Sequence, residues 1–314
     1  MRMCRACASF PLERESSSQK LDSGFRRNDE YPFVHSVCQK PRHFMRINCE
    51  LTARILEGFI RDELSKAGFA RAVVGLSGGI DSAVSCVLAA RALGPENVRA
   101  IMMPYKTSSQ ESLSDAQAVV DQFRIESETV DITGIVDGYF GSQPEVNTLR
   151  RGNAMARARM IVLFDKSMEH RALVLGTSNK TELLLGYGTL YGDMASAINP
   201  IGDLYKTDIF QLAAYLRVPE SILKKKPTAD LWAGQSDEEE LGFTYAAVDE
   251  LLYELIDRRS LPEKLVQKGF DEAFVHKVVR KIQGSQFKRR GPVICKLSPR
   301  SVTHDFHYLR DWGL

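Results

Sequence analysis

A short run of residues constrains the fold of this chain more than any other. It reads Val73-Val74-Gly75-Leu76-Ser77-Gly78-Gly79-Ile80-Asp81-Ser82. An apolar stretch typical of a buried strand ends in a Ser-Gly-Gly turn, and a helix is predicted to follow over Asp81–Leu93. Two glycines let the backbone approach an anion, and the amides of the turn and of the helix N-terminus then point at it. The run therefore predicts a phosphate-binding strand–loop–helix unit.

The charges of this loop differ from those of a Walker loop. A Walker loop carries Gly-x-x-x-x-Gly-Lys-[Ser/Thr], whereas this loop has no lysine and places Asp81 where a metal ion could bind. We interpret the combination as a binding site for the pyrophosphate end of ATP, from which AMP is transferred to a substrate. The alternative is a plain glycine turn between a strand and a helix, and the complete Ser-Gly-Gly-x-Asp-Ser string argues against it.

The composition of the whole chain argues against several classes of protein. Of the 314 residues 44% are hydrophobic, enough for a large core, and the net charge of +2 gives no reason to expect nucleic acid or an anionic membrane as a partner. No apolar run reaches the roughly 18 residues of a membrane span, and charged residues interrupt the N-terminus where a signal peptide would be apolar. Six scattered cysteines predict reduced thiols, so we expect a cytoplasmic protein.

The first 44 residues differ from the rest of the chain. They are poor in hydrophobic residues and show no periodicity, as expected of a segment that cannot fold alone. From Met45 an amphipathic pattern begins, and one face of the expected helix would contain Leu51, Ile55, Leu56, Phe59, Ile60 and Leu64. We therefore predict that residues 1–44 are a disordered or non-native extension and that residues 45–314 form one domain.

Strand-like and helical patterns alternate after the phosphate-binding loop. Helices are expected over residues 111–123 and 147–170, and the expected strands are Ala72–Leu76, Val98–Met103, Ser127–Ile132 and Ala172–Leu175. This order predicts an α/β fold with a doubly wound parallel sheet, followed after about Tyr205 by a mainly helical C-terminal part. Ligands of such sheets bind beyond the carboxyl ends of the strands, where the Ser77 loop falls.

A second motif follows the last expected strand and reads Gly176-Thr177-Ser178-Asn179-Lys180-Thr181-Glu182. Glu182 would then lie on the same rim of the sheet as Asp81. Because Mg²⁺ typically uses one or two carboxylates together with phosphate oxygens and waters, these two acids could bind it. Glu182 could instead be a first-turn acid that the helix dipole stabilises. Beside Asp81, the metal role is favoured.

Three basic residues are further candidates for anion binding. Lys206 stands at the start of an expected helix, where the dipole is unfavourable unless an anion lies nearby, and the alternative is a solvated side chain. Arg157 on the long helix and Lys288 near the C-terminus could bind a phosphate or a carboxylate. Helix arginines more often lie in solvent, and the basic run that contains Lys288 could instead contact RNA or form plain surface.

Taken together and in this order, the motifs resemble NAD synthetase. The resemblance covers the chain from about Met45 to the C-terminus and rests on residues 77–82, 176–182, 187–193, 206, 227–231 and 237–242. It implies the adenine-nucleotide α-hydrolase-like (Rossmann-like) fold of the ATP pyrophosphatases. It also implies the conversion of deamido-NAD (nicotinic acid adenine dinucleotide) to NAD, in which ATP adenylates the carboxylate, AMP and pyrophosphate are released, and ammonia supplies the nitrogen.

The resemblance also implies roles for individual positions. Asp81 and Glu182 would bind Mg²⁺ and act in catalysis with Lys206, and Arg157 and Lys288 would bind deamido-NAD. The positions expected to bind ATP are Gly75, Leu76, Ser77, Gly78, Gly79, Ile80, Asp81, Ser82, Thr177, Lys206 and Thr228. Because ammonia is mostly protonated at neutral pH, a carboxylate is expected to take a proton from ammonium, and the candidates are Asp193, Asp237 and Glu240.

Three positions differ from the pattern of some ammonia-dependent members, which bind the dinucleotide there. These positions are Leu190, Ala197 and Phe287. The stretch Thr189-Leu190-Tyr191-Gly192-Asp193 is closer to the synthetase part of glutamine-dependent enzymes, which carry a long amidase domain ahead of it. The leader before Met45 is too short for such a domain, so the implied nitrogen donor is ammonia, either free or from a separate partner. The family typically forms homodimers.

Two other functions could use the same loop. An RNA-modifying ATP pyrophosphatase would predict a strongly basic chain or paired cysteines near the site, and neither is present. A non-catalytic nucleotide-binding module of the same fold would not need Asp81 together with Glu182.

Overall fold

The structure is a computed structural model that describes residues 47–141, 143, 145–228 and 237–302. All of these residues fall within one compact unit. The predicted boundary at Met45 and the residues before it lie outside the described ranges. The division into an extension and a folded domain therefore stays a prediction.

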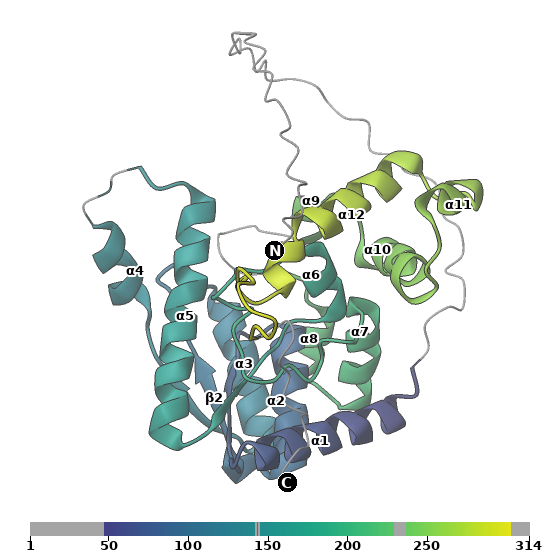
Figure 1. The fold of residues 1–314 in the computed structure, drawn as a ribbon. Helices are drawn as coiled ribbons and strands as arrows, with labels where there is room; N and C mark the ends of the chain where they lie inside the picture. The colour runs from purple at the N-terminus through teal and green to yellow at the C-terminus, as the bar shows by residue number, and fades with distance from the viewer. Residues whose placement is uncertain (1–46, 142, 144, 229–236, 303–314) are drawn as a thin grey trace. The chain divides into compact units, whose positions relative to one another are not determined.

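A four-stranded parallel sheet lies at the centre of this unit, in the order β3-β2-β1-β4 (Figure 1). Its strands are β1 (Ala72–Gly75), β2 (Val98–Met102), β3 (Glu126–Thr129) and β4 (Leu173–Leu175). The third strand is shorter than the predicted Ser127–Ile132. Beyond Thr129 the amides of Val130 and Ile132 still donate to the carbonyls of Met102 and Pro104, but Pro104 has no amide hydrogen with which to continue the ladder. The Ile132 side chain is buried among α4 and α5.

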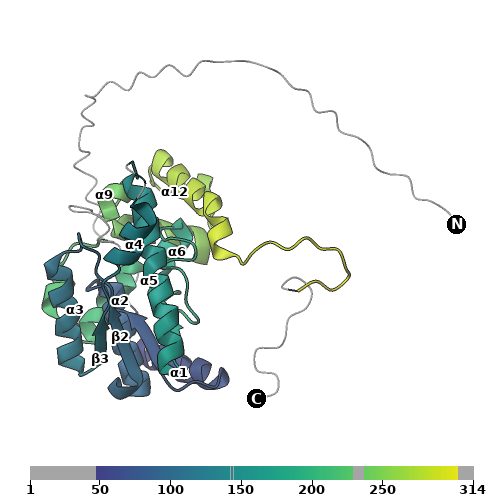
Figure 2. The ribbon, with the colours of Figure 1, turned by 90° about the vertical axis from the view of Figure 1, so that its left-hand side faces the viewer.

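Helices cover both faces of the sheet, so the predicted doubly wound α/β fold is confirmed (Figures 1 and 2). Val74 of β1 packs on one face and Val73 on the other, as alternation along a strand requires. The first face is covered by α1 (Cys49–Lys66), α2 (Ile80–Leu93), α3 (Gln110–Phe123) and α7 (Lys206–Tyr215). The second face is covered by α4 (Thr133–Phe140) and α5 (Thr148–His170).

The part of the chain after the sheet is helical, as predicted. Its apolar side chains form a separate cluster around Val248, Leu251 and Val275. The helices of this cluster are α6 (Lys180–Leu185), α9 (Asp237–Leu241), α10 (Tyr245–Leu252), the π-turn η2 (Tyr253–Asp257), α11 (Pro262–Gln267) and α12 (Glu272–Gly284). Shorter elements are η1 (Pro95–Asn97), α8 (Glu220–Lys224) and η3 (Gln286–Arg289).

The buried face of α1 differs from the face that the sequence predicted. Ile60 and Leu64 are buried as expected, together with Ala53, but Leu51 is 46% and Ile55 59% exposed. The apolar stripe of this helix is wider than the strip of surface that α2 and α7 can cover. Periodicity alone therefore does not decide which edge of the stripe is left in solvent.

The chain connections place the two predicted motifs side by side. The chain runs from β1 through β2 to β3 on one side of the sheet and then returns to add β4 on the other side of β1. The carboxyl ends of β1 and β4 therefore form a topological switch point, the usual position of a ligand in such a sheet. The Ser77–Ser82 loop leaves β1 at this point, and the Gly176–Glu182 segment leaves β4.

Two predictions from composition can be compared with the described part of the chain. No helix in it combines the length and the apolar content that a bilayer span needs. Three of the six cysteines lie within it, Cys49, Cys86 and Cys295, and all three are free thiols.

Glu254 in η2 joins three segments of the C-terminal cluster. Its buried carboxylate accepts hydrogen bonds from Lys268 Nζ (2.7 Å), Arg258 Nη1 (2.9 Å) and Ser260 Oγ (3.2 Å). The bond from Lys268, helped by Arg258 and opposed by burial, lowers the pKa of Glu254 from 4.5 to about 2. Since the folded pKa is the lower one, the resulting stability is present above pH 4.5 and is lost as the pH falls toward 2.

We predict that Glu254→Gln lowers the free energy of unfolding by about 2 kcal/mol at pH 7, a value reduced for the solvent screening of the half-exposed Lys268 and Arg258. The difference from the unmodified protein should shrink as the pH falls from 5 to 2, and urea denaturation across this range measures it. Glu145→Gln, at an exposed acid, should change stability by less than about 0.5 kcal/mol. A difference that did not vary with pH would contradict the assignment.

Candidate active site

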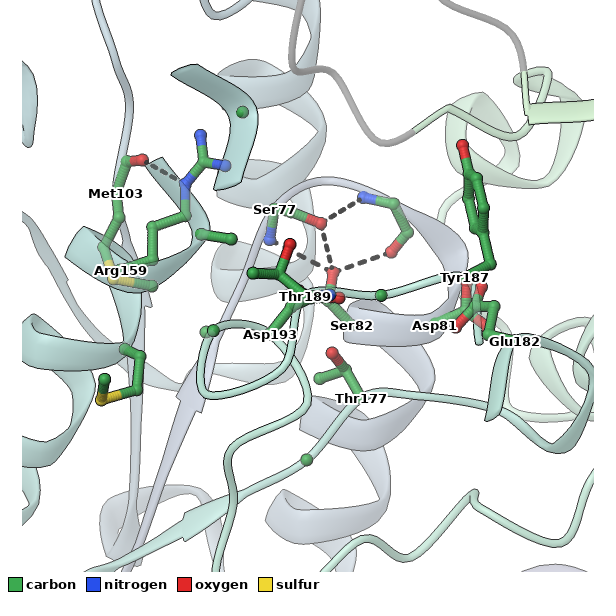
Figure 3. Close-up of a pocket in the computed structure, with 18 of the residues that line it drawn as sticks. Ser77, Asp81, Ser82, Met103, Arg159, Thr177, Glu182, Tyr187, Thr189 and Asp193 are labelled. Atoms are coloured by element: carbon green, nitrogen blue, oxygen red, sulfur yellow. Dashed lines mark hydrogen bonds between the residues drawn. The ribbon is translucent and has the colours of Figure 1, made fainter. Parts of the chain in front are cut away.

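A cavity of about 540 Å³ opens at the switch point between β1 and β4 (Figure 3). Its wall combines segments that are far apart in the sequence. Ser77 comes from the loop after β1, Met103 follows β2, Asn153 lies on α5 and Lys288 lies near the end of the described chain. A cavity of this size and position is the expected binding site of a small molecule.

The Ser77–Ser82 loop is held in shape by its own two serines. Ser82 Oγ donates to the carbonyl of Gly79 (2.9 Å) and accepts from the amide of Ser77 (3.2 Å), and the two serine hydroxyls lie 3.0 Å apart (Figure 3). Gly78 has φ +78°, a left-handed conformation that glycine adopts without strain. The loop is therefore the tight turn before a helix that the sequence predicted.

Asp81, Glu182 and Lys206 meet at the cavity, each from the first turn of a different helix. Lys206 Nζ lies 2.5 Å from Asp81 Oδ2 and 3.3 Å from Glu182 Oε1. Burial opposes the charge of Lys206, whose side chain is 3% exposed, but Asp81 and then Glu182 raise its pKa above the usual value. Burial and then the charge of Asp81 raise the pKa of Glu182, while Lys206 opposes this shift. The three residues predicted as catalytic are thus brought together.

Asn179 is a member of this cluster for which the sequence suggested no role. Its side-chain Nδ2 donates to Asp81 Oδ1 (2.8 Å), and its Oδ1 accepts from the amide of Glu182 (2.9 Å). Glu182 Oε2 in turn accepts from the amide of Asn179 (3.3 Å), which completes a capping box at the start of α6. The Asn-x-x-Glu spacing, which is typical of a capping box, is the sequence signal that could have identified Asn179. Glu182 is therefore both a first-turn helix acid and a neighbour of Asp81.

The donor set at this point fits a magnesium ion bound together with a substrate. Asp81 and Glu182 offer carboxylate oxygens, and Lys206 already lies between them as a cation. Within the described ranges, no group of three or more His, Cys, Asp or Glu side chains is arranged to hold a metal ion. An ion here would complete its shell with phosphate oxygens and water, which is the usual mode of Mg²⁺.

The residues expected to bind ATP lie around two adjoining cavities. Gly78 and Ile80 line a smaller cavity of about 90 Å³, which shares Ser77, Asp81 and Thr228 with the larger one. The expected residues that line the larger cavity are Gly75, Leu76, Ser77, Gly79, Asp81, Ser82, Thr177, Lys206 and Thr228. The rest of the predicted segment 227–231, from residue 229 on, lies outside the described residues.

The two residues expected to bind the dinucleotide occupy different places. Lys288 lines the cavity, where its Nζ donates to the carbonyls of Gly186 and Gly188 (2.7 Å each), and burial lowers its pKa. Arg157 is exposed on α5, donates to the carbonyl of Leu190 (3.3 Å) and is not among the residues that line the cavity. Of these two residues, only Lys288 thus lines the cavity.

All three candidate acceptors of a proton from ammonium line the cavity. Asp193 Oδ1 accepts from the amide of Thr189 (2.7 Å). Asp237 and Glu240 accept from the hydroxyl of Tyr187, at 3.0 Å and 2.9 Å, and Asp237 also accepts from the hydroxyl of Tyr245 (3.2 Å). Burial raises the pKa of Asp237. Tyr187 therefore lies between one buried acid, Asp237, and one exposed acid, Glu240.

Comparison with known proteins gives consistent matches. The profile of a family described as NAD synthase matches residues 52–292. A protein of Trichlorobacter lovleyi named NH(3)-dependent NAD(+) synthetase is 59% identical over 269 residues, which are 86% of this chain and 98% of that protein.

Two solved structures show the same likeness. The NH3-dependent NAD synthetase of Campylobacter jejuni subsp. jejuni, in complex with the nitrate ion, is 36% identical with a TM-score of 0.69 and covers 80% of this chain and 100% of its own. The NMN synthetase of Francisella tularensis is 30% identical with a TM-score of 0.71 and covers 80% of this chain and 99% of its own.

We predict that Gly78→Ala lowers the free energy of unfolding by about 2–3 kcal/mol and reduces the stabilisation of the protein by ATP. An added Cβ would lie 2.1 Å from the carbonyl oxygen of Ser112 in α3, and alanine is strained at φ +78°. Thermal denaturation with and without ATP measures both effects. In the control Gly138→Ala on α4, an added Cβ meets nothing within 4 Å, so stability should stay equal or rise by up to about 1 kcal/mol. A Gly78→Ala variant as stable as its parent would contradict this account of the loop.

Proposed function

Because this chain belongs to the NAD synthase family, we propose that it amidates deamido-NAD to NAD with ATP and ammonia. The family resemblance that the sequence predicted is confirmed by the profile match and by the 59% identity. The structural observation that supports the proposal best is the meeting of Asp81, Glu182 and Lys206 beside the Ser77–Ser82 loop.

The reaction needs an activated carboxylate. A nicotinate carboxylate repels nucleophiles and has no good leaving group. In the proposed first step, a carboxylate oxygen attacks the α-phosphorus of ATP, and the bond to the β-phosphate breaks to release pyrophosphate. In the second step, ammonia attacks the carbonyl carbon of the mixed anhydride, AMP leaves with the electrons of the broken C–O bond, and the new amide loses a proton.

The chain's own residues fit the first step. The loop amides and the N-terminus of α2 would bind the β- and γ-phosphates, where negative charge accumulates as pyrophosphate leaves. Lys206 would neutralise part of that charge, and Asp81 and Glu182 would hold the Mg²⁺ ion. Bound Mg²⁺ would supply Lewis-acid stabilisation of the phosphate oxygens. Thr177 and Thr228 line the same cavity and would contact ATP.

The second step requires a neutral ammonia molecule next to the mixed anhydride. Asp193, Asp237 and Glu240 line the cavity, and each remains a candidate to accept the proton of ammonium. Lys288 lines it too and would contact deamido-NAD. A contact to Arg157 would require the dinucleotide to extend beyond the cavity over the exposed side of α5.

The expected product pattern tests the function directly. Purified protein with ATP, Mg²⁺ and deamido-NAD should form NAD and AMP in equal amounts with ammonium, and none with glutamine as the nitrogen donor. Absence of NAD with both donors would contradict the proposal. Nicotinic acid mononucleotide serves as a second acceptor, because a structural relative is an NMN synthetase. A higher kcat/KM with the mononucleotide would overturn the dinucleotide assignment.

In the same assay, Asp81→Asn should slow NAD formation by about 10²–10³-fold or more. The change removes the carboxylate charge that pairs with Lys206 and that we propose binds Mg²⁺. Circular dichroism should show that the variant is folded. The matched control is Asp203→Asn, at a side chain that is 95% exposed, and it should retain the rate. Near-normal activity of Asp81→Asn would exclude the metal role.

We also propose a homodimer in which α5 contributes to the interface. Helix α5 carries apolar side chains in solvent: Ile161 is 55%, Phe164 43% and Met168 82% exposed. Their spacing places them along one side of the helix. An apolar stripe of this kind marks an interaction surface, and a second copy of the chain is the partner that the family resemblance implies.

The double change Ile161→Asp and Phe164→Asp should convert the dimer to monomers, because two buried charges would replace apolar contact in each subunit. Light scattering after size-exclusion chromatography gives the mass. The change Leu261→Asp, at a 58% exposed side chain just before α11, should leave the dimer intact. A monomeric unmodified protein, or a dimer that tolerates the double change, would contradict this interface.

A further inference from the structure

Asp249 in α10 is a completely buried carboxylate that does not line the cavity. Its Oδ1 accepts a hydrogen bond from the hydroxyl of Thr181 (2.5 Å), and its Oδ2 accepts from the amide of Thr207 (2.8 Å). The Thr181 hydroxyl in turn accepts from the amide of Lys206 (3.0 Å). A single carboxylate therefore reaches two successive backbone amides of α7, one directly and one through a threonine.

These bonds connect the two helix starts that carry the charged cluster. Thr181 is the neighbour of Glu182 in the first turn of α6, and Lys206 and Thr207 are the first two residues of α7. The first amides of a helix have no partner within the helix, so an acceptor from elsewhere decides how a helix start is held. Asp249 is that acceptor for α7, and the same carboxylate binds α6 through Thr181.

The burial of Asp249 carries a desolvation cost that its surroundings must offset. A buried carboxylate is destabilised unless hydrogen bonds and favourable charges surround it. Here both oxygens are bonded, and the positive end of the α7 dipole adjoins them. The neighbouring buried acid Asp208 differs, because its Oδ2 accepts from the amide of Tyr205 within the start of its own helix (3.1 Å). This bond stays within the start of α7 and does not connect two helices.

We infer that Asp249 is a positioning residue: acting through Thr181 and the amide of Thr207, it sets where Glu182 and Lys206 lie relative to each other. This inference rests on the proposed function, since it assigns Asp249 to the alignment of the groups that bind ATP. It also gives the C-terminal helices a part in the reaction, because α10 belongs to their apolar cluster. A misplacement of about 1 Å at reacting groups can cost about 10²-fold in rate.

The experiment compares variants that each change one side chain of this hydrogen-bond network. Thr181→Val keeps the volume and removes the hydroxyl, Thr181→Ser keeps the hydroxyl, and Asp249→Asn keeps the shape and removes the charge. The control is Glu254→Gln, because Glu254 is a buried acid in η2 whose partners are Arg258, Ser260 and Lys268. For each variant, kcat and KM are measured with ammonium, the melting temperature is recorded, and the Kd for ATP is measured by calorimetry at 15 °C.

We expect Thr181→Val and Asp249→Asn to lower kcat/KM at least tenfold and to weaken ATP binding at least fivefold, while Thr181→Ser stays within threefold of the unmodified protein. Glu254→Gln should lower the melting temperature and leave kcat/KM and ATP binding unchanged. If Thr181→Val and Asp249→Asn behave like Glu254→Gln, lowering the melting temperature but leaving kcat/KM and ATP binding unchanged, the role of Asp249 is purely structural and the inference is wrong.

Two further outcomes are covered by the same design. Should Asp249→Asn fail to fold, the comparison of Thr181→Val with Thr181→Ser decides the question. Should the unmodified protein form no NAD, the proposed function fails, but ATP binding by the Thr181 pair still tests the positioning role. Equal ATP affinity of the two Thr181 variants would then overturn it.

Discussion

The attraction between Lys206 and the carboxylates of Asp81 and Glu182 is the interaction on which the rest of the site depends. Lys206 could not be buried as a cation without a large desolvation cost unless the two acids faced it. Burial and the neighbouring Asp81 in turn raise the pKa of Glu182, which Lys206 opposes. A second cation beside the two carboxylates would lower the pKa of Glu182 and favour the ionised form of both acids. A site of this kind suits a phosphate substrate that arrives with a magnesium ion.

Three helix N-termini meet at this cluster, which explains its electrostatics. Asp81 stands in the first turn of α2, Glu182 in that of α6 and Lys206 in that of α7. The positive ends of the helix dipoles stabilise the two acids and would attract the phosphates of ATP. Lys206 stands against its own dipole, and the two acids compensate for this. The convergence of these helix starts thus places two carboxylates and a lysine beside positive dipole ends, as the proposed binding of Mg²⁺ and ATP requires.

Local sequence patterns were sufficient to predict part of this site, and the features that they did not predict depend on tertiary packing. The Ser77–Ser82 turn and the Asn179–Glu182 helix start are encoded within a few residues, so the sequence located both. The exposed part of α1 and the early end of β3 depend on which residues lie beside them, and periodicity carries no such information. Arg157 matched a motif but lies outside the cavity, because its direction on α5 depends on how that helix packs.

The sequence by itself determined the family, the order of strands and helices, and the residue types at the two strand ends, because these follow from short patterns and local hydrogen bonds. Only the tertiary structure decided which distant groups touch. Sequence separation says nothing about the 2.5 Å between Lys206 and Asp81, or about Asp249 reaching the starts of α6 and α7 from a later helix. Such contacts arise when layers of the fold pack together, since packing brings helix ends with unsatisfied amides next to buried acids.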